Sequence, residues 1–331
     1  MHEKLKIAGL VTGITIKSAV QAIIIPILTS MYTSMNFILM VTSLQFMLIF
    51  GGIYIYLVRK NGFIVPQRKR LIILSGTFTA LMSLLMIYSA NTSRTPVIIQ
   101  AILAGMPVLP SVILRKIFLN KVVVYNRILI GLSILFMLGS ISISTIPLYS
   151  HGNFEISDIL WIGMYLLGVI CMSVYNMLQE KYIVETGDSS FYNKVIMMFY
   201  SRIVEFAVFI GFSWIEYFIG FTDNPVTAFF DSIKLFGNSA SASLLLEGFI
   251  IAYLVSFALG IELNAISTNY NMLIPTIANP LVIVFFTIFG SLNHGIHYPV
   301  WIVCTCIGLS TIGMILWVKG ETNKDNYLTI N

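Results

Sequence analysis

The chain has 331 residues, of which 57% are hydrophobic and only 10% are charged, and its mean hydropathy is +0.90. Soluble domains carry roughly 25% charged residues, so this composition excludes a soluble fold and predicts an integral membrane protein. The formal net charge is +5, but the basic residues are grouped in alternate segments between apolar runs, which is the pattern of membrane topology and not that of a nucleic-acid-binding surface.

Breaking the chain at charge clusters and turn residues gives ten apolar runs, each near the length of about 20 residues that a spanning helix needs. The runs cover residues 5–29, 36–58, 71–90, 95–114, 127–148, 158–180, 191–219, 243–263, 267–290 and 298–318. We therefore expect an all-α membrane protein with ten transmembrane helices, forming a single transmembrane domain over residues 1–331.

The basic residues set the expected orientation. Fifteen of the nineteen lie in alternate segments that begin with the N-terminus, Arg94 and Lys234 lie in the other segments, and Lys17 and Arg202 lie inside apolar runs. Because Lys and Arg are enriched in cytoplasmic loops, this distribution predicts that both termini are cytosolic.

Residues typical of catalysis or metal binding are not grouped in the sequence. Cys171, Cys304 and Cys306 all fall within predicted spans, and no HExxH, Walker or dinucleotide glycine pattern is present. The histidines lie at chain ends or in outer loops; they are His2, His151, His294 and His297. We expect no enzymatic activity, no cofactor and no metal.

In the first run, Lys17 lies near the middle of the apolar stretch GITIKSAVQAIIIP. A charged residue at that depth costs a few kcal/mol on insertion scales, about 3 kcal/mol at the centre of a helix. Two interpretations remain open: Lys17 faces a water-filled path and attracts an anionic group, or it has a structural partner such as Glu180 or Glu205.

A repeated pattern links two parts of the chain, which are separated by 173 residues and which each cover the junction of two predicted helices. The matching residues are Asn91, Thr95 and Pro107 in the first half and Asn264, Thr268 and Pro280 in the second. An offset of five helices is odd, so the second copy enters the membrane from the opposite side, as in many secondary transporters. The predicted halves are 5–148 and 158–318.

Each repeated threonine is a predicted N-cap, and each proline follows it by twelve residues, about 18 Å along a helix. Proline lacks the N–H group, so the carbonyls of Leu103 and Thr276, four residues earlier, lose their helical partners. The open interpretations are a structural kink at each proline or a central cavity between the two matching helices.

Further polar residues interrupt the apolar runs. Asn176 and Glu180 are one turn apart, which places them on one helix face and makes Glu180 a candidate for proton coupling or a solvated residue beside Lys181. Arg202 and Glu205 are three residues apart and predict a structural ion pair, with Glu205 as a second proton-coupling candidate.

Uncharged donors lie near the two junctions, where they suit either a solute with amide-like groups or hydrogen bonds between helices. The candidate substrate-binding residues are Lys17, Asn91, Thr95, Gln100, Asn176, Asn264, Thr268 and Asn271.

The sequence resembles the drug/metabolite transporter superfamily, and within it the chloroquine-resistance-transporter-like family. The points of resemblance are Lys17 in the first helix, the stretch NTSRTPVIIQAILAGMPVLPSVILRKIFLNKVVVYNRILIGLSI, the pair Asn176 and Glu180, and the stretch STNYNMLIPTIANPLVIVFF. The resemblance covers residues 5–318 and implies ten helices in two inverted halves.

The resemblance also implies a function. Members of this family carry small solutes such as amino acids, peptides, thiols or cationic drugs out of an acidic or organellar compartment, often with protons. Lys17, Asn176 and Glu180 would then line the cavity or couple protons. The loop at 220–242 lacks the cysteines of the vacuolar members, and Ile16 replaces the asparagine that they carry before the lysine, which leaves the substrate open.

The main hypothesis is a secondary-active carrier that works by alternating access, with a small-molecule substrate, the lipid bilayer and protons as partners. It would act as a monomer or homodimer in a vacuolar, lysosomal or other organellar membrane, with no nucleic-acid partner. One alternative is a nucleotide-sugar or sugar-phosphate antiporter, which needs fixed cations in the cavity. The other is a membrane receptor or scaffold that transports nothing.

Overall fold

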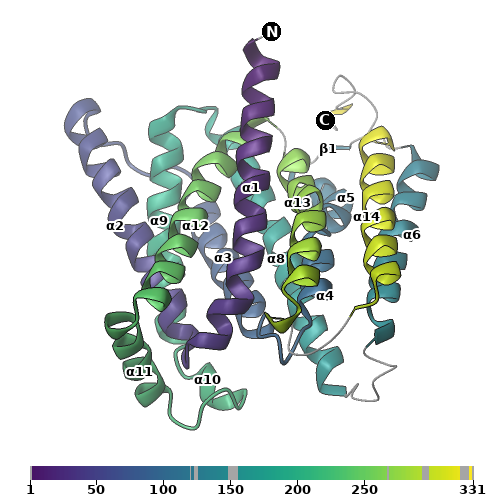
Figure 1. Ribbon diagram of the computed structural model, residues 1–331. Coiled ribbons are helices and arrows are strands. Elements are labelled where there is room, and N and C mark those ends of the chain that lie inside the picture. Colours follow the sequence, from purple (N-terminus) through teal and green to yellow (C-terminus); the bar gives the residue numbers. More distant parts are fainter. Residues whose placement is uncertain are drawn as a thin grey trace.

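The structure is a computed structural model that describes residues 2–119, 121–122, 126–147, 156–266, 268–292, 298–320 and 328–329. Helices make up almost all of it (Figure 1). The longer helices are α1 (His2–Met31), α2 (Met35–Asn61), α3 (Lys69–Ser89), α6 (Arg127–Ser144), α8 (Ile156–Thr186), α9 (Phe191–Gly211), α12 (Ala240–Ile266), α13 (Thr268–Ile288) and α14 (Val300–Gly320). The shorter ones are α4 (Val97–Ala104), α5 (Val108–Leu119), α10 (Ile215–Phe218), α11 (Pro225–Asn238) and the 3-10 helix η1 (Gly290–Leu292).

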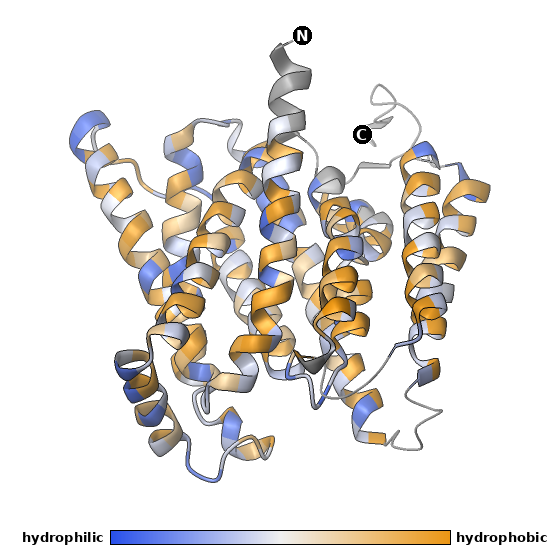
Figure 2. Cartoon of the chain, viewed as in Figure 1, coloured by the Kyte–Doolittle hydropathy of each residue, from blue (hydrophilic) through white to orange (hydrophobic). Residues whose placement is uncertain are grey.

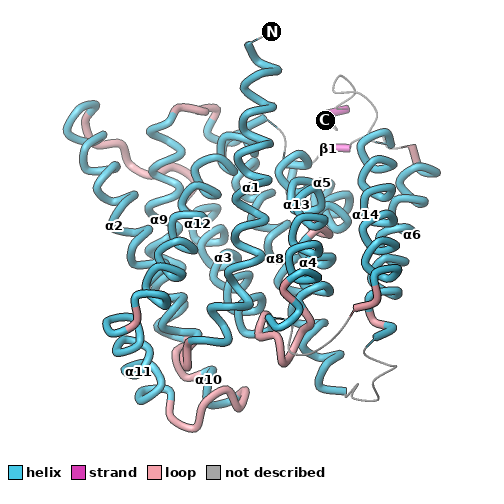
Figure 3. The backbone as a smooth tube through the Cα atoms, in the orientation of Figure 1, coloured by secondary structure: helices cyan, strands magenta, loops and turns pink. Residues whose placement is uncertain are grey.

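Eight helices in the described part of the chain are long and apolar enough to cross a membrane. The number becomes nine if the segment 97–119, which bends by 41°, is counted as one span. Apolar residues run along most of the length of the long helices (Figure 2). The described loops lie at their ends (Figure 3), apart from the break between α4 and α5. The chain is therefore a multi-pass membrane protein by the length and composition of its helices.

The helices pack in pairs, most of which join segments that are far apart in the sequence. Helix α2 contacts α9, α4 contacts α13, and α6 contacts α14. In addition α1 contacts α12 and α13, while α8 contacts α3 and α5. Helices that are distant in sequence therefore lie side by side, and no long helix packs only against its neighbours in the chain.

Small residues allow the closest of these contacts. A Cβ atom built on Gly76 of α3 would lie 2.5 Å from the Ser201 carbonyl oxygen and 2.7 Å from the Val204 Cβ of α9. A Cβ atom on Gly168 of α8 would lie 2.6 Å from the Met86 Cγ of α3. Close backbone approach at small residues is the usual way in which helices associate in lipid, where burial of apolar surface gives little driving force.

The segment 95–114 was expected to be one kinked helix capped by Thr95, and the structure corrects this. Helix α4 begins after Pro96, which occupies the N-cap position without a side-chain hydrogen bond, and it ends at Ala104. Helix α5 starts directly after Pro107. The Leu103 carbonyl is not left open, because it accepts a hydrogen bond of 2.9 Å from the Met106 N–H. Tightening of the last turn therefore replaces the bond that proline cannot make.

The second repeated proline behaves differently. Helix α13 continues through both Pro275 and Pro280 without ending. The hydroxyl of Thr276 in α13 donates a hydrogen bond of 2.6 Å to the carbonyl of Gly105, at the break between α4 and α5. The two matching segments thus meet each other directly, but only the first of them is interrupted.

The predicted seventh run, 191–219, is also shorter than expected. Helix α9 ends at Gly211, and the short helix α10 follows after a turn. The amphipathic stretch in the loop 220–242 forms helix α11, which begins with the N-cap Asn224. At the other end of the bundle, a two-residue strand, β1 (Lys121–Val122), pairs antiparallel with β2 (Leu328–Thr329).

Candidate functional site

A cavity of about 90 Å³ lies among α1, α3, α8, α12 and α13. It has room for several water molecules but is smaller than a site for a drug-sized ligand, for which roughly 300 Å³ is the lower limit. Its polar lining residues are Lys17, Ser18, Gln21, Tyr175, Asn176, Gln179, Tyr253, Ser256 and Asn271, and it contains no carboxylate among the lining residues that the structure describes.

Among the described residues that line this cavity, Lys17 is the only cationic one. It lies halfway along α1, and its ammonium group donates a hydrogen bond to the hydroxyl of Ser256 on α12. Neither of the two structural partners considered from the sequence reaches it, because Glu180 pairs with Arg115 and Glu205 pairs with Arg202. An ammonium group has three N–H donors, so a single hydroxyl leaves most of its capacity for another acceptor.

Four side-chain amides meet where α8, α12 and α13 come together. Asn264 Nδ2 donates to Asn176 Oδ1 at 3.1 Å and to Gln179 Oε1 at 2.6 Å. Asn271 Nδ2 donates to Asn176 Oδ1 at 3.2 Å and to Asn264 Oδ1 at 3.1 Å. This amide cluster holds three helices together and presents Asn176, Gln179 and Asn271 to the cavity, while Asn264 supports them from behind.

The cavity is rich in hydrogen-bond donors that the described residues do not use. Gln21 of α1 is 8% exposed, and its Nε2 group has no acceptor. Asn176 lines the cavity and accepts through its oxygen in the amide cluster, so its own N–H groups take no part in that cluster. Together with the Lys17 ammonium, these donors favour an anionic or strongly accepting group, because a buried donor without an acceptor costs about 1–3 kcal/mol.

Aromatic side chains form one wall of the cavity and separate it from a buried ion pair. Tyr253 and Phe257 of α12 line the cavity, and the guanidinium of Arg202 stacks on the Phe257 ring at 4.1 Å from its centroid. Arg202 Nη1 lies 2.6 Å from Glu205 Oε2, and Ser43 donates a hydrogen bond to the same oxygen. Both charges are thus balanced within α9 and do not enter the cavity lining.

Glu180, one turn beyond Asn176, does not line the cavity. It is 7% exposed and lies 3.1 Å from Arg115 Nη2, so α8 and α5 are joined by a buried ion pair. The sequence offered two roles for Glu180, a proton acceptor in the cavity or a solvated residue beside Lys181. The structure places it in neither environment.

Three of the candidate residues support the loop between α3 and α4 and lie outside the cavity lining. Asn91 donates to the Thr29 carbonyl and accepts from the Ser93 N–H. Gln100 donates to the carbonyls of Ala90 and Thr95 at 2.8 and 2.6 Å. Thr95 itself is fully buried. Thr268 begins α13, but its side chain and that of Asn269 lie outside the described residues, as do His151, His294 and His297.

Several lining residues were not singled out from the sequence. Gln179 lies three residues after Asn176 and shares its helix face, so its position carried a signal. Gln21 lies four residues after Lys17 and shares its helix face, so its position carried the same signal. Ser256 and Tyr253 carried none, because single polar residues in apolar helices commonly form structural hydrogen bonds. Only the packing of α1 against α12 identifies them as neighbours of Lys17.

Comparison of the sequence with protein-family models and with curated proteins finds no match. The functional interpretation of the cavity therefore depends on its own geometry.

Proposed function

We propose that the protein is a secondary-active carrier of small polar organic solutes that bear a carboxylate, and that its substrate site is the cavity around Lys17. The observation that carries this proposal is the Lys17 ammonium group, which lies halfway along a spanning helix with a hydroxyl as its described partner and with further unused donors beside it. A carboxylate offers the acceptors that these groups lack.

The helix contacts support alternating access by two halves, 5–148 and 158–318. In an inverted repeat, each helix of the first half corresponds to the helix five spans later, so that α1 corresponds to α8, α3 to α12, and α4 with α5 to α13. The contact of α1 with α12 then corresponds to the contact of α8 with α3, and the contact of α1 with α13 corresponds to that of α8 with α5. The contacts of α2 with α9, of α4 with α13 and of α6 with α14 each join two corresponding helices, so the exchange leaves them unchanged. This is the contact pattern expected of an inverted repeat of ten spans.

This proposal adds α9 to the nine spans counted above. Helix α9 is 21 residues long but carries Lys194, Arg202 and Glu205. Arg202 and Glu205 neutralise each other, and Lys194 lies 2.7 Å from Glu262 of α12. Pairing of intramembrane charges within the bundle is how a helix of this kind is accommodated in lipid. The resemblance to the drug/metabolite transporter superfamily agrees with this arrangement, and so does a cytosolic location of both termini.

The cavity favours some of the expected solutes over others. A lining with one ammonium group and no carboxylate among the described residues disfavours drug-like cations. A nucleotide sugar or sugar phosphate requires more fixed positive charge than a single lysine supplies. Amino acids, short peptides and thiols such as glutathione combine a carboxylate with amide or amine groups that match the amide cluster.

Proton coupling through Glu180 or Glu205 would require a buried ion pair to open, since each carboxylate contacts an arginine. We therefore propose that either carboxylate takes up a proton only during the conformational change, when its ion pair opens. A Glu180→Gln protein whose uptake keeps the wild-type dependence on pH would exclude Glu180 from this role.

The test is uptake into proteoliposomes of the purified protein, offered amino acids, glutathione and nucleotide sugars with and without a pH gradient. For each accepted solute, Lys17→Ala should weaken apparent affinity about tenfold, the effect of losing one hydrogen bond to a charged group. The matched control is Lys234→Ala, which removes an exposed cation on α11 whose described ion pair is with Asp231.

The outcomes separate the functional classes. Uptake no greater than in protein-free liposomes for every solute would support a receptor or scaffold. Uptake that Lys17→Ala leaves unchanged would make the lysine structural and contradict the assigned site. Preference for nucleotide sugars over amino acids would favour the antiporter.

A further inference from the structure

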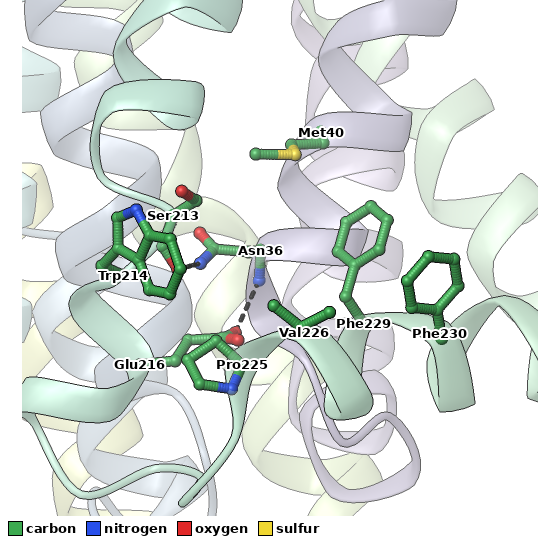
Figure 4. A pocket seen from close by; sticks show the side chains of 9 residues that line it. All are labelled: Asn36, Met40, Ser213, Trp214, Glu216, Pro225, Val226, Phe229 and Phe230. Carbon is green, nitrogen blue, oxygen red and sulfur yellow. Dashed lines mark hydrogen bonds between the residues drawn. The ribbon is translucent and has the colours of Figure 1, made fainter.

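A second pocket, of about 220 Å³, lies at the end of the bundle between α2, the turn from α9 to α10, and α11 (Figure 4). It shares no lining residue with the cavity around Lys17. Its lining consists of Asn36, Met40, Ser213, Trp214, Glu216, Pro225, Val226, Phe229 and Phe230. No cationic residue is found among these nine.

Asn36 brings an unused acceptor to the pocket. Its side chain is 2% exposed and extends from α2 toward Ser213 (Figure 4), and its Nδ2 group donates to the Ser213 carbonyl at 2.7 Å. No described residue donates to its Oδ1 atom. A ligand in this pocket is therefore expected to supply an N–H or O–H donor.

Glu216 adds a buried carboxyl group beside that acceptor. The residue is fully buried, and its carboxylate accepts hydrogen bonds from the Asn36 backbone N–H at 2.8 Å and from the Ser34 hydroxyl at 3.0 Å. Within the described part of the chain, no Lys or Arg forms an ion pair with it. Burial raises the pKa of Glu216, and the hydrogen bonds from Asn36 and Ser34 oppose this rise, so a cation would stabilise the carboxylate further.

The remainder of the pocket suits a cation that arrives from the membrane. Trp214, Phe229 and Phe230 supply aromatic rings, which attract ammonium groups through their faces. Trp214 is 60% exposed and Phe230 is 58% exposed. Exposed aromatic residues at the end of a spanning bundle, next to the amphipathic helix α11, are typical of the membrane interface, where lipid headgroups lie.

We propose that this pocket binds the primary ammonium group of a membrane lipid with an ethanolamine headgroup. The ammonium donates to Asn36 Oδ1 and faces the Glu216 carboxylate, while Trp214 and Phe230 cover it on the open side. A choline headgroup carries the same charge but has no N–H donor, so it leaves the Asn36 acceptor unused. This proposal does not depend on the carrier function, because the pocket is separate from the cavity.

The test is native mass spectrometry of the full-length protein, delipidated in detergent and titrated with phosphatidylethanolamine or phosphatidylcholine of identical acyl chains. The wild-type protein should bind one phosphatidylethanolamine about tenfold more tightly than phosphatidylcholine, as expected for a hydrogen bond that involves a charged group. Glu216→Gln and Asn36→Ala should each reduce this preference to less than about twofold.

Glu247→Gln is the matched control, because Glu247 is a hydrogen-bonded carboxylate on α12 outside the pocket and should leave the preference unchanged. If Glu216→Gln fails to fold, Asn36→Ala and Trp214→Leu decide the outcome, since Asn36→Ala keeps the backbone bond to Glu216. Equal affinities of the wild-type protein for the two lipids would overturn the proposal. Displacement of the bound lipid by an equal concentration of free ethanolamine would overturn the assignment to a lipid.

Discussion

The residues around Lys17 show how polar groups are divided between structure and function inside this bundle. Arg115, Arg202 and Lys194 each contact a carboxylate, which balances their charge. Lys17 instead contacts a hydroxyl in a cavity. Since a buried charge is stable only when it is paired or hydrated, a cavity beside the lysine is a physical requirement as well as the proposed binding site.

The amide cluster supports a prediction about charge selectivity. Asn176→Asp keeps the shape of the side chain and its acceptor for Asn264 and Asn271, but it adds a carboxylate to the cavity that contains Lys17. The introduced carboxylate competes with the substrate for the ammonium group. We expect uptake of carboxylate solutes to fall at least about tenfold, measured as initial rates in proteoliposomes.

Asn126→Asp is the control for this change. Asn126 is the N-cap of α6 and accepts from the backbone N–H groups of Ile128 and Leu129, a role that aspartate fills equally well. Its uptake should equal that of the wild-type protein. An Asn176→Asp protein with normal uptake would show that Asn176 does not face the substrate.

For single residues, the sequence was most informative about polar side chains inside apolar runs, where their burial is costly. Lys17, Asn176 and Asn271 were predicted as site residues because they interrupt apolar runs, and all three line the same cavity. Asn91 and Gln100 also interrupt the apolar pattern, but they satisfy loop carbonyls. A sequence cannot distinguish these two uses, because the backbone groups that need a partner are fixed only when the loop is folded.

Among the helices, the contact of α3 with α9 gives a prediction about stability. Gly76→Ala places a methyl group 2.5 Å from the Ser201 carbonyl oxygen, so the helices must separate. Overpacking of this kind costs about 1–3 kcal/mol. We expect a lower melting temperature in detergent, measured by size-exclusion chromatography of heated samples.

Gly163→Ala in α8 is the matched control, since no atom lies within 4 Å of the added Cβ. Alanine favours a helix over glycine by about 1 kcal/mol, so this protein should be as stable as the wild type or more stable. A Gly76→Ala protein that melts with the control would mean that α3 and α9 do not pack as closely as described.

The location of the helices could be predicted from the sequence, but their interruptions could not. Each of the ten apolar runs contains a helix in the structure, because long apolar segments have no other stable form in lipid. The prolines at 107 and 280 have the same spacing in sequence, yet α4 and α5 are separated at the first and α13 continues past the second. At the first proline, the Leu103 carbonyl accepts from the Met106 N–H and the Gly105 carbonyl accepts from the Thr276 hydroxyl of α13, and such partners are not visible in a single sequence.

For the molecule as a whole, Arg94 joins three parts of the chain at the end opposite the N-terminus. Its guanidinium lies 3.9 Å from the centre of the Trp161 ring of α8 and 4.8 Å from that of Phe221 in the loop before α11. It also donates to the Tyr88 carbonyl at the end of α3. Arg94 thus connects α3, α8 and the loop before α11 at that end, whereas the cavity lining includes Asn271, close to where α12 passes into α13.

Under alternating access, weakening this contact should shift the protein toward the state that is open at the Arg94 end. A pair of cation–π contacts is worth about 1 kcal/mol, so Arg94→Gln should change the population about fivefold. The measurement is the rate at which an impermeant thiol reagent modifies Ser256→Cys from each side of the membrane, in a chain that also carries Cys304→Ser.

Modification from the Arg94 side should accelerate in Arg94→Gln and stay unchanged in Lys234→Gln, which removes an exposed cation at the same end. Equal rates in all three proteins would show that Arg94 does not control access to the cavity.

The composition predicted a membrane protein, and the structure agrees with eight or nine helices that are apolar enough to span. The expected ten crossings stay a prediction, because α9 contains three charged residues whose compensation depends on other helices. The inverted repeat was inferred from three matching residues, whereas the strongest support for it comes from the exchange of helix pairs. Such pairing is a property of the folded bundle and has no counterpart in a single sequence.

Under the proposed carrier function, the amide cluster has a consequence for how well the protein distinguishes one solute from another. Its members already bond to one another, so a solute that draws them apart must replace each lost bond with one of its own. Binding then depends on the match between two sets of hydrogen bonds. A molecule of the right size with one donor or acceptor misplaced leaves one of these bonds unreplaced, which costs about 1–3 kcal/mol. Selectivity in this bundle would thus arise from exchange of partners, which a purely apolar cavity of the same volume cannot provide.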